Sequence, residues 1–408
     1  MAWLLSPAHV RRLAGETDRL LAFGAAARTA NGFGWLDEAG RPDAARPTEL
    51  WITCRMTHVY ALGAMLDRPG CTELADHGVA TLSRSFADAE HGGWFTSIDR
   101  KGPVDSAKGA YPHAFVILAA ASAAAAARPG AALLLSAALD VSLRHFWDDD
   151  AGMVVESWDR TFSTAEPYRG VNAAMHTVEA YLAAADATGD RSWLDRAVRT
   201  TRRVLDLARD NDWRIPEHFD ADLRPLWEYN ADTPADQFRP YGATIGHAFE
   251  WSRLALNARA ALLARGDHPD GAWLRDATAL FDAAVRDGWQ ADGAPGFVYT
   301  VDWDGAPVLR QRLHWVLCEA LGAAATLFHV TGEQRFDEAY RTWWEYAETH
   351  VIDHDGGSWW HELSPEHAVA RSVWSGKPDL YHAIQATLIP RLPPAPSLAS
   401  ALARGLLA

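Results

Sequence analysis

Hydrophobic and polar positions divide the chain into helical segments and short turns rich in glycine and aromatic residues. The helical segments are amphipathic or rich in alanine and follow one another in twos, as at 48–66 and 71–87 or at 111–127 and 131–146. This pattern predicts pairs of helices. The glycine–aromatic segments instead alternate apolar and polar residues, as at 297–303, which predicts short β-hairpins that cap one end of each pair.

Six of these turn segments recur at nearly regular intervals. They lie at 31–35, 91–95, 150–153, 212–215, 293–297 and 355–359. Measured between Gly34, Gly93, Gly152, Arg214, Gly296 and Gly357, the successive differences in position are 59, 59, 62, 82 and 61. The longest interval indicates an insertion around 221–240. A period of about sixty residues is longer than that of the common solenoid repeats.

Six helix pairs provide twelve helices, which can close into a ring. We therefore predict an all-α fold, an (α/α)6 barrel with short β-hairpins at its mouth, with residues 1–408 forming a single catalytic domain. Inner helices rich in small residues would pack closely around a concave mouth. The chain has 19 tryptophans, and although some of them fill the core, aromatic rings at the mouth would stack on the C–H faces of a sugar.

Composition and charge limit the partners and the compartment. The formal net charge of -15 argues against binding to nucleic acid or to an anionic membrane. Cys54, Cys71 and Cys318 are an odd set without CxxC spacing, which favours neither disulfides nor a cysteine zinc site. The longest apolar stretch, 114–127, is too short to span a bilayer. We expect a cytoplasmic monomer or homodimer that binds a neutral small molecule.

Three histidines on predicted helices each have a polar residue three or four positions away. They are His176 with Asn172, His247 with Glu250, and His382 with Gln385. Residues at this spacing lie on one face of a helix. A single histidine of this kind is more often a satisfied core or surface residue. Three in the same setting indicate one pocket assembled from several helices.

The helix predicted at 48–66 carries a candidate cation for this pocket. Trp51, Arg55 and His58 share one helix face. An arginine on an otherwise apolar helix is costly to bury unless a polar group meets it. Ligand binding and a structural salt bridge are equal alternatives for Arg55 at this point. Tyr111 and His113 lie near the start of the next helix of this kind.

Three classes of protein that could use such a barrel are an inverting glycosidase, a binding module without activity and a metal-dependent isomerase. An inverting glycosidase needs two carboxylates that flank the scissile bond, and Asp150, Glu166, Glu217 and Glu362 lie in turns, but the helical histidines would then have no role. A sugar-binding or protein-binding module without activity would keep the tryptophans and could lose His247 or His382. A metal-dependent isomerase needs ligands at metal-binding spacing.

The sequence does not favour the metal-dependent class. His354–Asp355 and His361–Glu362 are close together, but they lie in a turn and are expected to be polar surface residues. On the predicted inner helices we find no convincing ligand cluster. We therefore expect no metal and no cofactor.

Three long motifs resemble one known family. They are WITCRMTHVY at 51–60, RPYGATIGHAFEW at 239–251 and KPDLYH at 377–382. They are similar to signatures of the N-acylglucosamine 2-epimerase superfamily, in particular its aldose–ketose isomerase branch of mannose isomerases and sulfoquinovose isomerases. The resemblance covers nearly the whole chain. It implies a metal-free (α/α)6 barrel that interconverts an aldose with a ketose, or with its C2 epimer.

The resemblance also assigns site residues. It implies two catalytic histidines, His247 and His382, and a third histidine in the site, His176. The residues implied to contact the sugar are Trp51, Arg55, Tyr111, Asn172, Arg239, Glu250 and Trp315, with Glu217, Trp374 and Gln385 as weaker candidates.

A histidine has an unperturbed pKa of about 6.5, which suits removal of the weakly acidic proton on C2 of an aldose. We expect His382 to move this proton between C2 and C1 through a cis-enediol(ate), and His247, oriented by Glu250, to be the second acid/base. His176 and Arg55 would polarise the sugar oxygens. The expected monosaccharide pair is D-mannose and D-fructose. The alternatives are 2-epimerisation of mannose, glucose or cellobiose-type sugars, and isomerisation of sulfoquinovose, for which Arg55 and Arg239 could supply a basic subsite.

Overall fold

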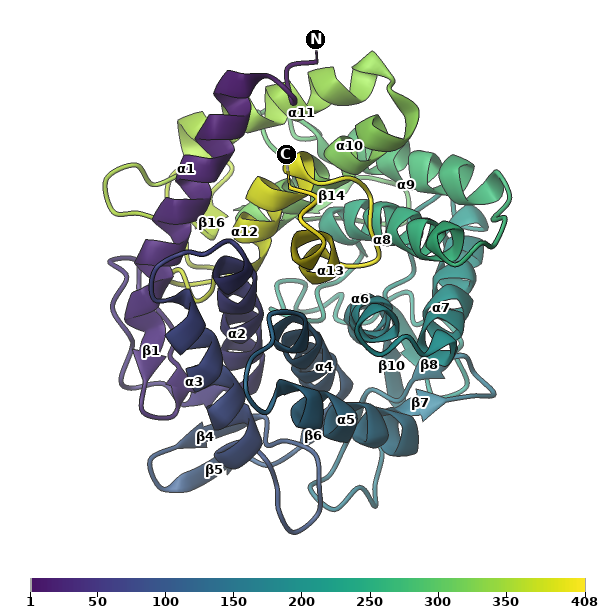
Figure 1. Cartoon of the computed structure of the whole chain (residues 1–408). Helices are drawn as coiled ribbons and strands as arrows, with labels where there is room; N and C mark the ends of the chain where they lie inside the picture. Colours follow the sequence, from purple (N-terminus) through teal and green to yellow (C-terminus); the bar gives the residue numbers. More distant parts are fainter. Residues whose placement is uncertain (1, 408) are drawn as a thin grey trace.

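A computed structural model describes residues 2–407 and arranges twelve helices in two concentric rings (Figure 1). The inner ring consists of α2 (Leu50–Met65), α4 (Ala110–Ala125), α6 (Val171–Thr188), α8 (Ile245–Ala264), α10 (His314–Thr331) and α12 (Tyr381–Leu388). The outer ring consists of α1 (Pro7–Gly24), α3 (Cys71–Arg84), α5 (Ala131–Val141), α7 (Arg191–Arg209), α9 (Ala272–Gly288) and α11 (Gln334–Tyr346). The predicted (α/α)6 barrel is confirmed.

The two rings differ in side-chain pattern as their positions require. The inner helix α4 is buried along most of its length, and its alanines, such as Ala119 and Ala120, allow close packing against neighbouring helices. The outer helix α7 instead buries one stripe, which includes Leu194, Ala197 and Val204, and exposes charged residues on its other face. A helix that is apolar all round belongs in the interior, and an amphipathic one at the surface.

Short antiparallel strands connect the repeats at the mouth of the barrel, as predicted. Each of five inner helices is preceded by a strand that pairs with a strand of the following repeat. The pairs are β3 (Thr48–Glu49) with β4 (Ser97–Asp99), β6 (Lys108–Gly109) with β9 (Ser157–Trp158), β10 (Tyr168–Gly170) with β11 (His218–Asp220), β12 (Ala243–Thr244) with β13 (Thr300–Val301), and β15 (Arg312–Leu313) with β16 (Glu362–Leu363). This pairing fixes the N-terminal ends of the inner helices.

Further strands form hairpins within single repeats. β5 (Gly102–Asp105) and β14 (Pro307–Leu309) extend two of the sheets, while β1 (Arg28–Thr29) pairs with β2 (Gly32–Phe33) and β7 (Trp147–Asp148) with β8 (Met153–Val154). The predicted insertion is the long segment between β11 and β12, which the structure describes without a helix or strand. Its Phe238 packs against Trp51, Tyr111 and Trp374 at the mouth.

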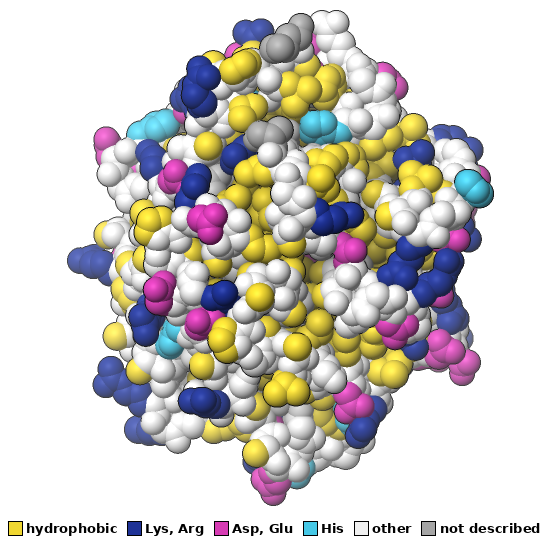
Figure 2. Space-filling model, in the orientation of Figure 1, with side chains coloured by type: hydrophobic (Ala, Val, Ile, Leu, Met, Phe, Trp, Pro, Cys, Tyr) yellow, Lys and Arg dark blue, Asp and Glu magenta, His cyan; other side chains and the backbone are white. Residues whose placement is uncertain are grey.

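The opposite end of the barrel is covered by the C-terminal part of the chain. After the 3₁₀ turn η4 (Ile389–Arg391), the short helix α13 (Leu398–Ala403) packs against α2, α4 and α6 (Figure 1). The repeat pattern did not predict this helix. Figure 2 shows that hydrophobic side chains gather in the middle of this face, with acidic and basic side chains interspersed around them. Among residues 2–407, no helix has the length and apolar character needed to cross a membrane.

Candidate active site

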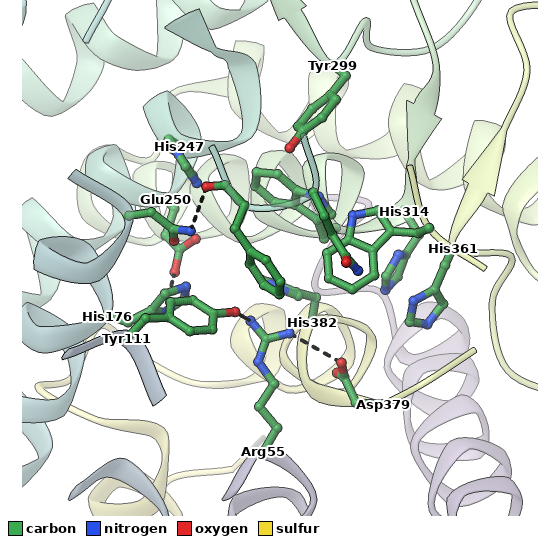
Figure 3. A pocket seen from close by; sticks show the side chains of 15 residues that line it. Arg55, Tyr111, His176, His247, Glu250, Tyr299, His314, His361, Asp379 and His382 are labelled. Carbon is green, nitrogen blue, oxygen red and sulfur yellow. Dashed lines mark hydrogen bonds and ion pairs between the residues drawn. The ribbon is translucent and has the colours of Figure 1, made fainter. Parts of the chain in front are cut away.

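A cavity of about 40 Å³ lies where the N-terminal ends of the inner helices meet (Figure 3). Its walls combine five histidines with a small number of charged and aromatic residues. They include His176, His247, His314, His361 and His382 together with Arg55, Tyr111, Asn172, Glu250, Trp315 and Asp379. The structure thus brings together the three histidines predicted from the sequence and most of the predicted sugar-contacting residues.

His247 is bonded through one ring nitrogen to a buried carboxylate. Its Nδ1 lies 3.0 and 2.9 Å from the two carboxylate oxygens of Glu217, which also accepts the Thr244 amide N–H at 3.3 Å. Nδ1–H therefore donates to Glu217, which leaves Nε2 as the proton acceptor of the ring. The expectation that Glu250 orients His247 is wrong. Glu217 precedes β11 and is 30 residues from His247, so helical spacing could not reveal the pair.

His382 has the same arrangement on the other side of the cavity. Its Nδ1 is 2.9 Å from Glu319 Oε1. Glu319 is held in turn by Arg253, whose Nε and Nη2 donate to Oε2 at 3.0 and 2.9 Å. Burial holds the pKa of His382 well below its ordinary value, so the ring is a neutral base at neutral pH. Gln385, the neighbour at helical spacing, instead donates to Glu179 at 3.3 Å.

Arg55 is both a salt-bridge partner and a lining residue of the cavity. Its Nη1 is 3.3 Å from Asp379 Oδ2, and its Nη2 donates to the Tyr111 hydroxyl at 2.9 Å. Burial opposes the charge, but Tyr111 and Asp379 raise the pKa of Arg55 above its ordinary value. The guanidinium is therefore a fixed cation at the cavity wall. Arg55 thus forms a structural salt bridge, one of the two alternatives left open by the sequence, and it also lines the cavity, where ligand binding stays a prediction.

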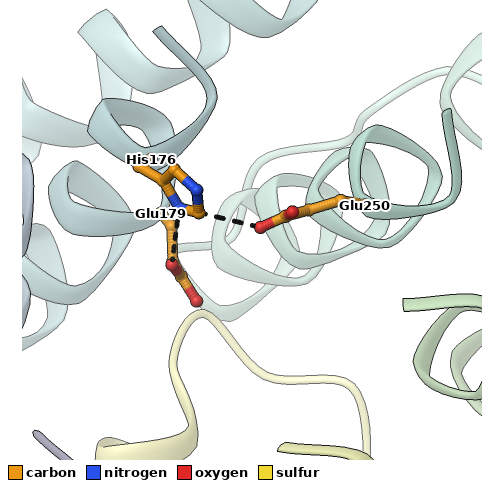
Figure 4. Close-up of side chains that lie close together, drawn as sticks. All are labelled: His176, Glu179 and Glu250. Carbon is orange, nitrogen blue, oxygen red and sulfur yellow. Dashed lines mark ion pairs between the residues drawn. The ribbon is translucent and has the colours of Figure 1, made fainter. Parts of the chain in front are cut away.

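A third histidine lies between two carboxylates (Figure 4). His176 Nδ1 is 3.7 Å from Glu179 Oε2, one turn along α6, and 3.8 Å from Glu250 Oε1 on α8. Burial lowers the pKa of His176 to about 4, and burial together with Glu319 raises the pKa of Glu250. These three side chains could hold a metal ion. The sequence did not indicate this cluster, because Glu250 comes from a different helix than His176 and Glu179.

Two predicted sugar-contacting residues lie beside this histidine-lined cavity and not in its wall. Trp51 and Arg239 line a neighbouring cavity of about 300 Å³, which shares Tyr111, Asn172 and Phe238 with the first. Arg239 bonds to both oxygens of Glu166 at 2.6 and 3.0 Å. Two further candidates, Trp315 and Trp374, line the histidine-lined cavity itself.

The sequence did not indicate the paired rings of His314 and His361. They stack with centroids 3.7 Å apart in the cavity wall. Burial lowers the pKa of His314 to about 4 and that of His361 well below its ordinary value. The expectation that His361 and Glu362 are surface residues is wrong: Glu362 lies in β16, which pairs with β15, and the carbonyl of the preceding His361 accepts the His314 amide N–H, so the two residues are only 5% and 1% exposed. His354 does lie at the surface.

Comparisons with known proteins place this geometry in context. The family model for N-acylglucosamine 2-epimerase (GlcNAc 2-epimerase) matches residues 32–386. The chain is 51% identical over 405 residues to a D-mannose isomerase from Thermobifida fusca, with 98% of each chain covered. It is 51% identical over 406 residues to a D-mannose isomerase from Pseudomonas cannabina pv. alisalensis, covering 98% of this chain and 97% of that one. A crystal structure of D-mannose isomerase superposes with a TM-score of 0.87 at 27% identity, over 94% of this chain and 98% of that chain.

Proposed function

Because the chain belongs to the N-acylglucosamine 2-epimerase family, we propose that it is an aldose–ketose isomerase that interconverts D-mannose and D-fructose. The observation that carries this proposal is the arrangement of His247 and His382. Both line one cavity, and each is bonded through Nδ1 to a buried carboxylate. Of two such bases, one can transfer a proton at carbon and the other can transfer protons at the oxygen atoms of one bound sugar. The near full-length identity to D-mannose isomerases supports mannose as the substrate.

In the proposed reaction, His382 transfers the proton that distinguishes aldose from ketose. Nε2 takes the proton from C2 of the open-chain aldose, and the C–H electron pair forms the C1–C2 double bond of a cis-enediolate. The electron pair of the C1 carbonyl moves onto O1. Return of the proton to C1, with formation of the carbonyl at C2, gives the ketose. A neutral imidazole suits this step because a base must be unprotonated to accept the proton.

The second histidine handles protons on oxygen. His247, with Nδ1–H fixed on Glu217, would exchange a proton with the ring oxygen during opening and with O1 and O2 during isomerisation. Arg55 and His176 would face the oxygens that carry negative charge in the enediolate. A fixed guanidinium in a buried site stabilises such charge more than water does. The N-terminal ends of the inner helices add to this effect.

Two features favour a neutral monosaccharide over the alternative substrates. The identity of 51% to D-mannose isomerases exceeds the 23% identity to a cellobiose 2-epimerase from Ruminococcus albus, which disfavours cellobiose-type substrates. Arg239 is engaged with Glu166, which disfavours a sulfonated sugar at that position. We further propose that the reaction needs no metal or other cofactor and that the enzyme acts in the cytoplasm.

Product analysis tests this function. The purified protein is incubated separately with D-mannose, D-glucose, D-lyxose and cellobiose, with and without EDTA, and the products are identified by NMR. We expect fructose from mannose at a rate that EDTA does not change. Formation of glucose from mannose without fructose would identify an epimerase. Loss of activity with EDTA that a divalent ion restores would overturn the metal-free mechanism.

A further inference from the structure

The cluster of His176, Glu179 and Glu250 leaves polar atoms without partners in the interior. Among residues 2–407, His176 Nδ1 and Glu250 Oε2 are buried atoms that form no hydrogen bond. The two residues are only 4% and 0% exposed, so water does not replace the missing partners. Buried polar atoms are nearly always paired. The gaps of 3.7 and 3.8 Å around His176 Nδ1 are too long for hydrogen bonds. A metal ion about 2.0–2.2 Å from each ligand atom spans such gaps.

Charge at the same place favours a cation. The carboxylates of Glu179, Glu250 and Glu319 all interact with a single guanidinium, that of Arg253. Burial raises the pKa of both Glu250 and Glu319, because one guanidinium does not fully compensate three carboxyl groups in the interior. Arg55, the next cation, is already engaged by Asp379. Uncompensated buried charge is costly, and one divalent cation would balance it.

The ligand types indicate which cation fits. One imidazole and two carboxylates suit Zn²⁺ and neighbouring transition metals, whereas Ca²⁺ and Mg²⁺ prefer oxygen ligands alone. One carboxylate is already held by other side chains, since Glu179 accepts hydrogen bonds from the Tyr381 hydroxyl and from Gln385 Nε2. Such outer contacts orient metal ligands.

We propose that His176, Glu179 and Glu250 bind a divalent transition-metal ion and that this ion inhibits the enzyme by competing with the sugar. His176 and Glu250 line the catalytic cavity, so the open coordination positions of the ion face the space that the sugar needs. The inhibitory part rests on the proposed isomerase function, and the binding part does not. In this proposal the metal ion takes no part in the reaction, and turnover does not require that the site is occupied.

Glu179→Gln is the most informative variant. Glu179 does not line the catalytic cavity; it lines a separate cavity toward the C-terminal segment, together with His58 and Arg253. The substitution removes one anionic ligand and changes the shape of the side chain little. Glu16→Gln is the matched control, because Glu16 is a buried carboxylate outside the cluster, where it accepts a bond from Trp359 Nε1.

Binding is measured first, without reference to activity. The metal-free protein is titrated with Co²⁺, followed by its visible d–d absorption, and with Zn²⁺ by calorimetry. We expect one ion per chain in the wild type and in Glu16→Gln, and at least about 10-fold weaker binding in Glu179→Gln. An absence of stoichiometric binding to the wild type would overturn the proposal even if Glu179→Gln fails to fold. Equal binding by a folded Glu179→Gln would overturn the site.

Inhibition is measured next, with mannose as the varied substrate. Zn²⁺ should raise the apparent KM without lowering kcat, and EDTA should reverse this effect. In Glu179→Gln, the same Zn²⁺ concentration should change the rate much less, relative to the rate of that variant without metal. A metal effect on kcat alone, or activation by Zn²⁺, would overturn the competitive model. If mannose is not a substrate, the binding result stands and the proposed function fails.

Discussion

At the scale of single residues, the carboxylates of Glu217 and Glu319 determine which ring nitrogen of His247 and of His382 carries the proton. A hydrogen bond to a charged group contributes about 1.5–3 kcal/mol, so Glu217 and Glu319 each favour the tautomer with the proton on Nδ1. They also stabilise the imidazolium that forms when Nε2 accepts a proton. The same principle operates in other histidine bases paired with a carboxylate.

Removal of either negative charge should therefore slow turnover. We expect Glu217→Gln and Glu319→Gln to lower kcat by roughly 10- to 100-fold with a smaller change in KM, because a neutral amide stabilises the imidazolium less. Steady-state kinetics on folded variants measures this. Glu38→Gln is the control, since Glu38 pairs with Arg371 near the surface. Unchanged kcat in both buried variants would show that neither carboxylate assists proton transfer.

Only part of this chemistry was accessible from the sequence. Helical spacing and the family motifs identified His176, His247 and His382, because those signals are local. The true partners Glu217 and Glu319 lie 30 and 63 residues from their histidines, and only the closed barrel brings them together. His361 was misjudged for a related reason: its turn position suggested exposure, and the pairing of β16 that buries it is a long-range contact.

At the scale of elements, the segment between β11 and β12 forms part of the mouth. The Phe238 ring lies 6.0 Å from Trp51, 5.5 Å from Tyr111 and 5.7 Å from Trp374, measured between centroids. It lines both the catalytic cavity and the larger neighbouring cavity. The side chain thus separates the two spaces.

Phe238→Ala should join the two cavities. We expect the KM for mannose to rise by about 10-fold, since aromatic packing of this kind contributes about 0.5–1.5 kcal/mol beyond area burial, and we expect larger sugars to gain access. Kinetics with mannose and with a disaccharide measures both effects. Trp227→Ala, in the same segment but at an exposed position, should leave KM unchanged. An unaltered KM in Phe238→Ala would show that the Phe238 side chain does not shape the sugar-binding cavity.

His113 links α4 to the preceding turn and makes that link sensitive to pH. Its Nδ1 donates to the Gly109 carbonyl at 2.7 Å, and its Nε2 accepts the Trp94 amide N–H at 3.1 Å. Burial lowers its pKa to about 3. The unfolded chain, with a pKa of about 6.5, binds the proton first as the pH falls. The stabilising contribution of this residue is thus complete above pH 6.5 and is lost as the pH falls toward 3.

A comparison of wild type with His113→Gln isolates this contribution. The difference in free energy of unfolding should shrink by about 2 kcal/mol between pH 8 and pH 5, because only the wild type carries the titrating group. Denaturant unfolding of both proteins at each pH measures this difference. A difference that stays constant across this range would show that His113 is not held neutral in the folded state.

At the scale of the whole molecule, the barrel was the most predictable feature. Six glycine–aromatic turns at a regular interval and alanine-rich segments such as 114–127 specify helix pairs without any long-range information. The helices begin and end close to their predicted positions, as α4 at Ala110–Ala125 illustrates. Helix α13 and the route of the segment around Phe238 lie outside the repeat pattern. Their positions depend on packing against surfaces that only the assembled barrel creates.

This architecture explains why the catalytic groups come from so many parts of the chain. Each inner helix directs its N-terminal turns toward one cavity, and strand pairs fix these turns in five of the six helices. His176, His247 and His382 come from three different repeats. In the proposed reaction, these repeats together move a proton between C2 and C1 of a sugar through an enediolate.

The most direct test of this claim is the position of deuterium in the product when D-mannose is converted in D₂O, measured by NMR. Proton transfer through an enediolate allows exchange of the proton on the base with solvent, so we expect fructose with deuterium at C1 in a substantial fraction of molecules. In His382→Asn, both fructose formation and deuterium incorporation should fall by on the order of 10²-fold. Fructose without any deuterium at C1 would indicate a hydride shift, and deuterium at C2 of glucose would indicate epimerisation; either result would contradict the account.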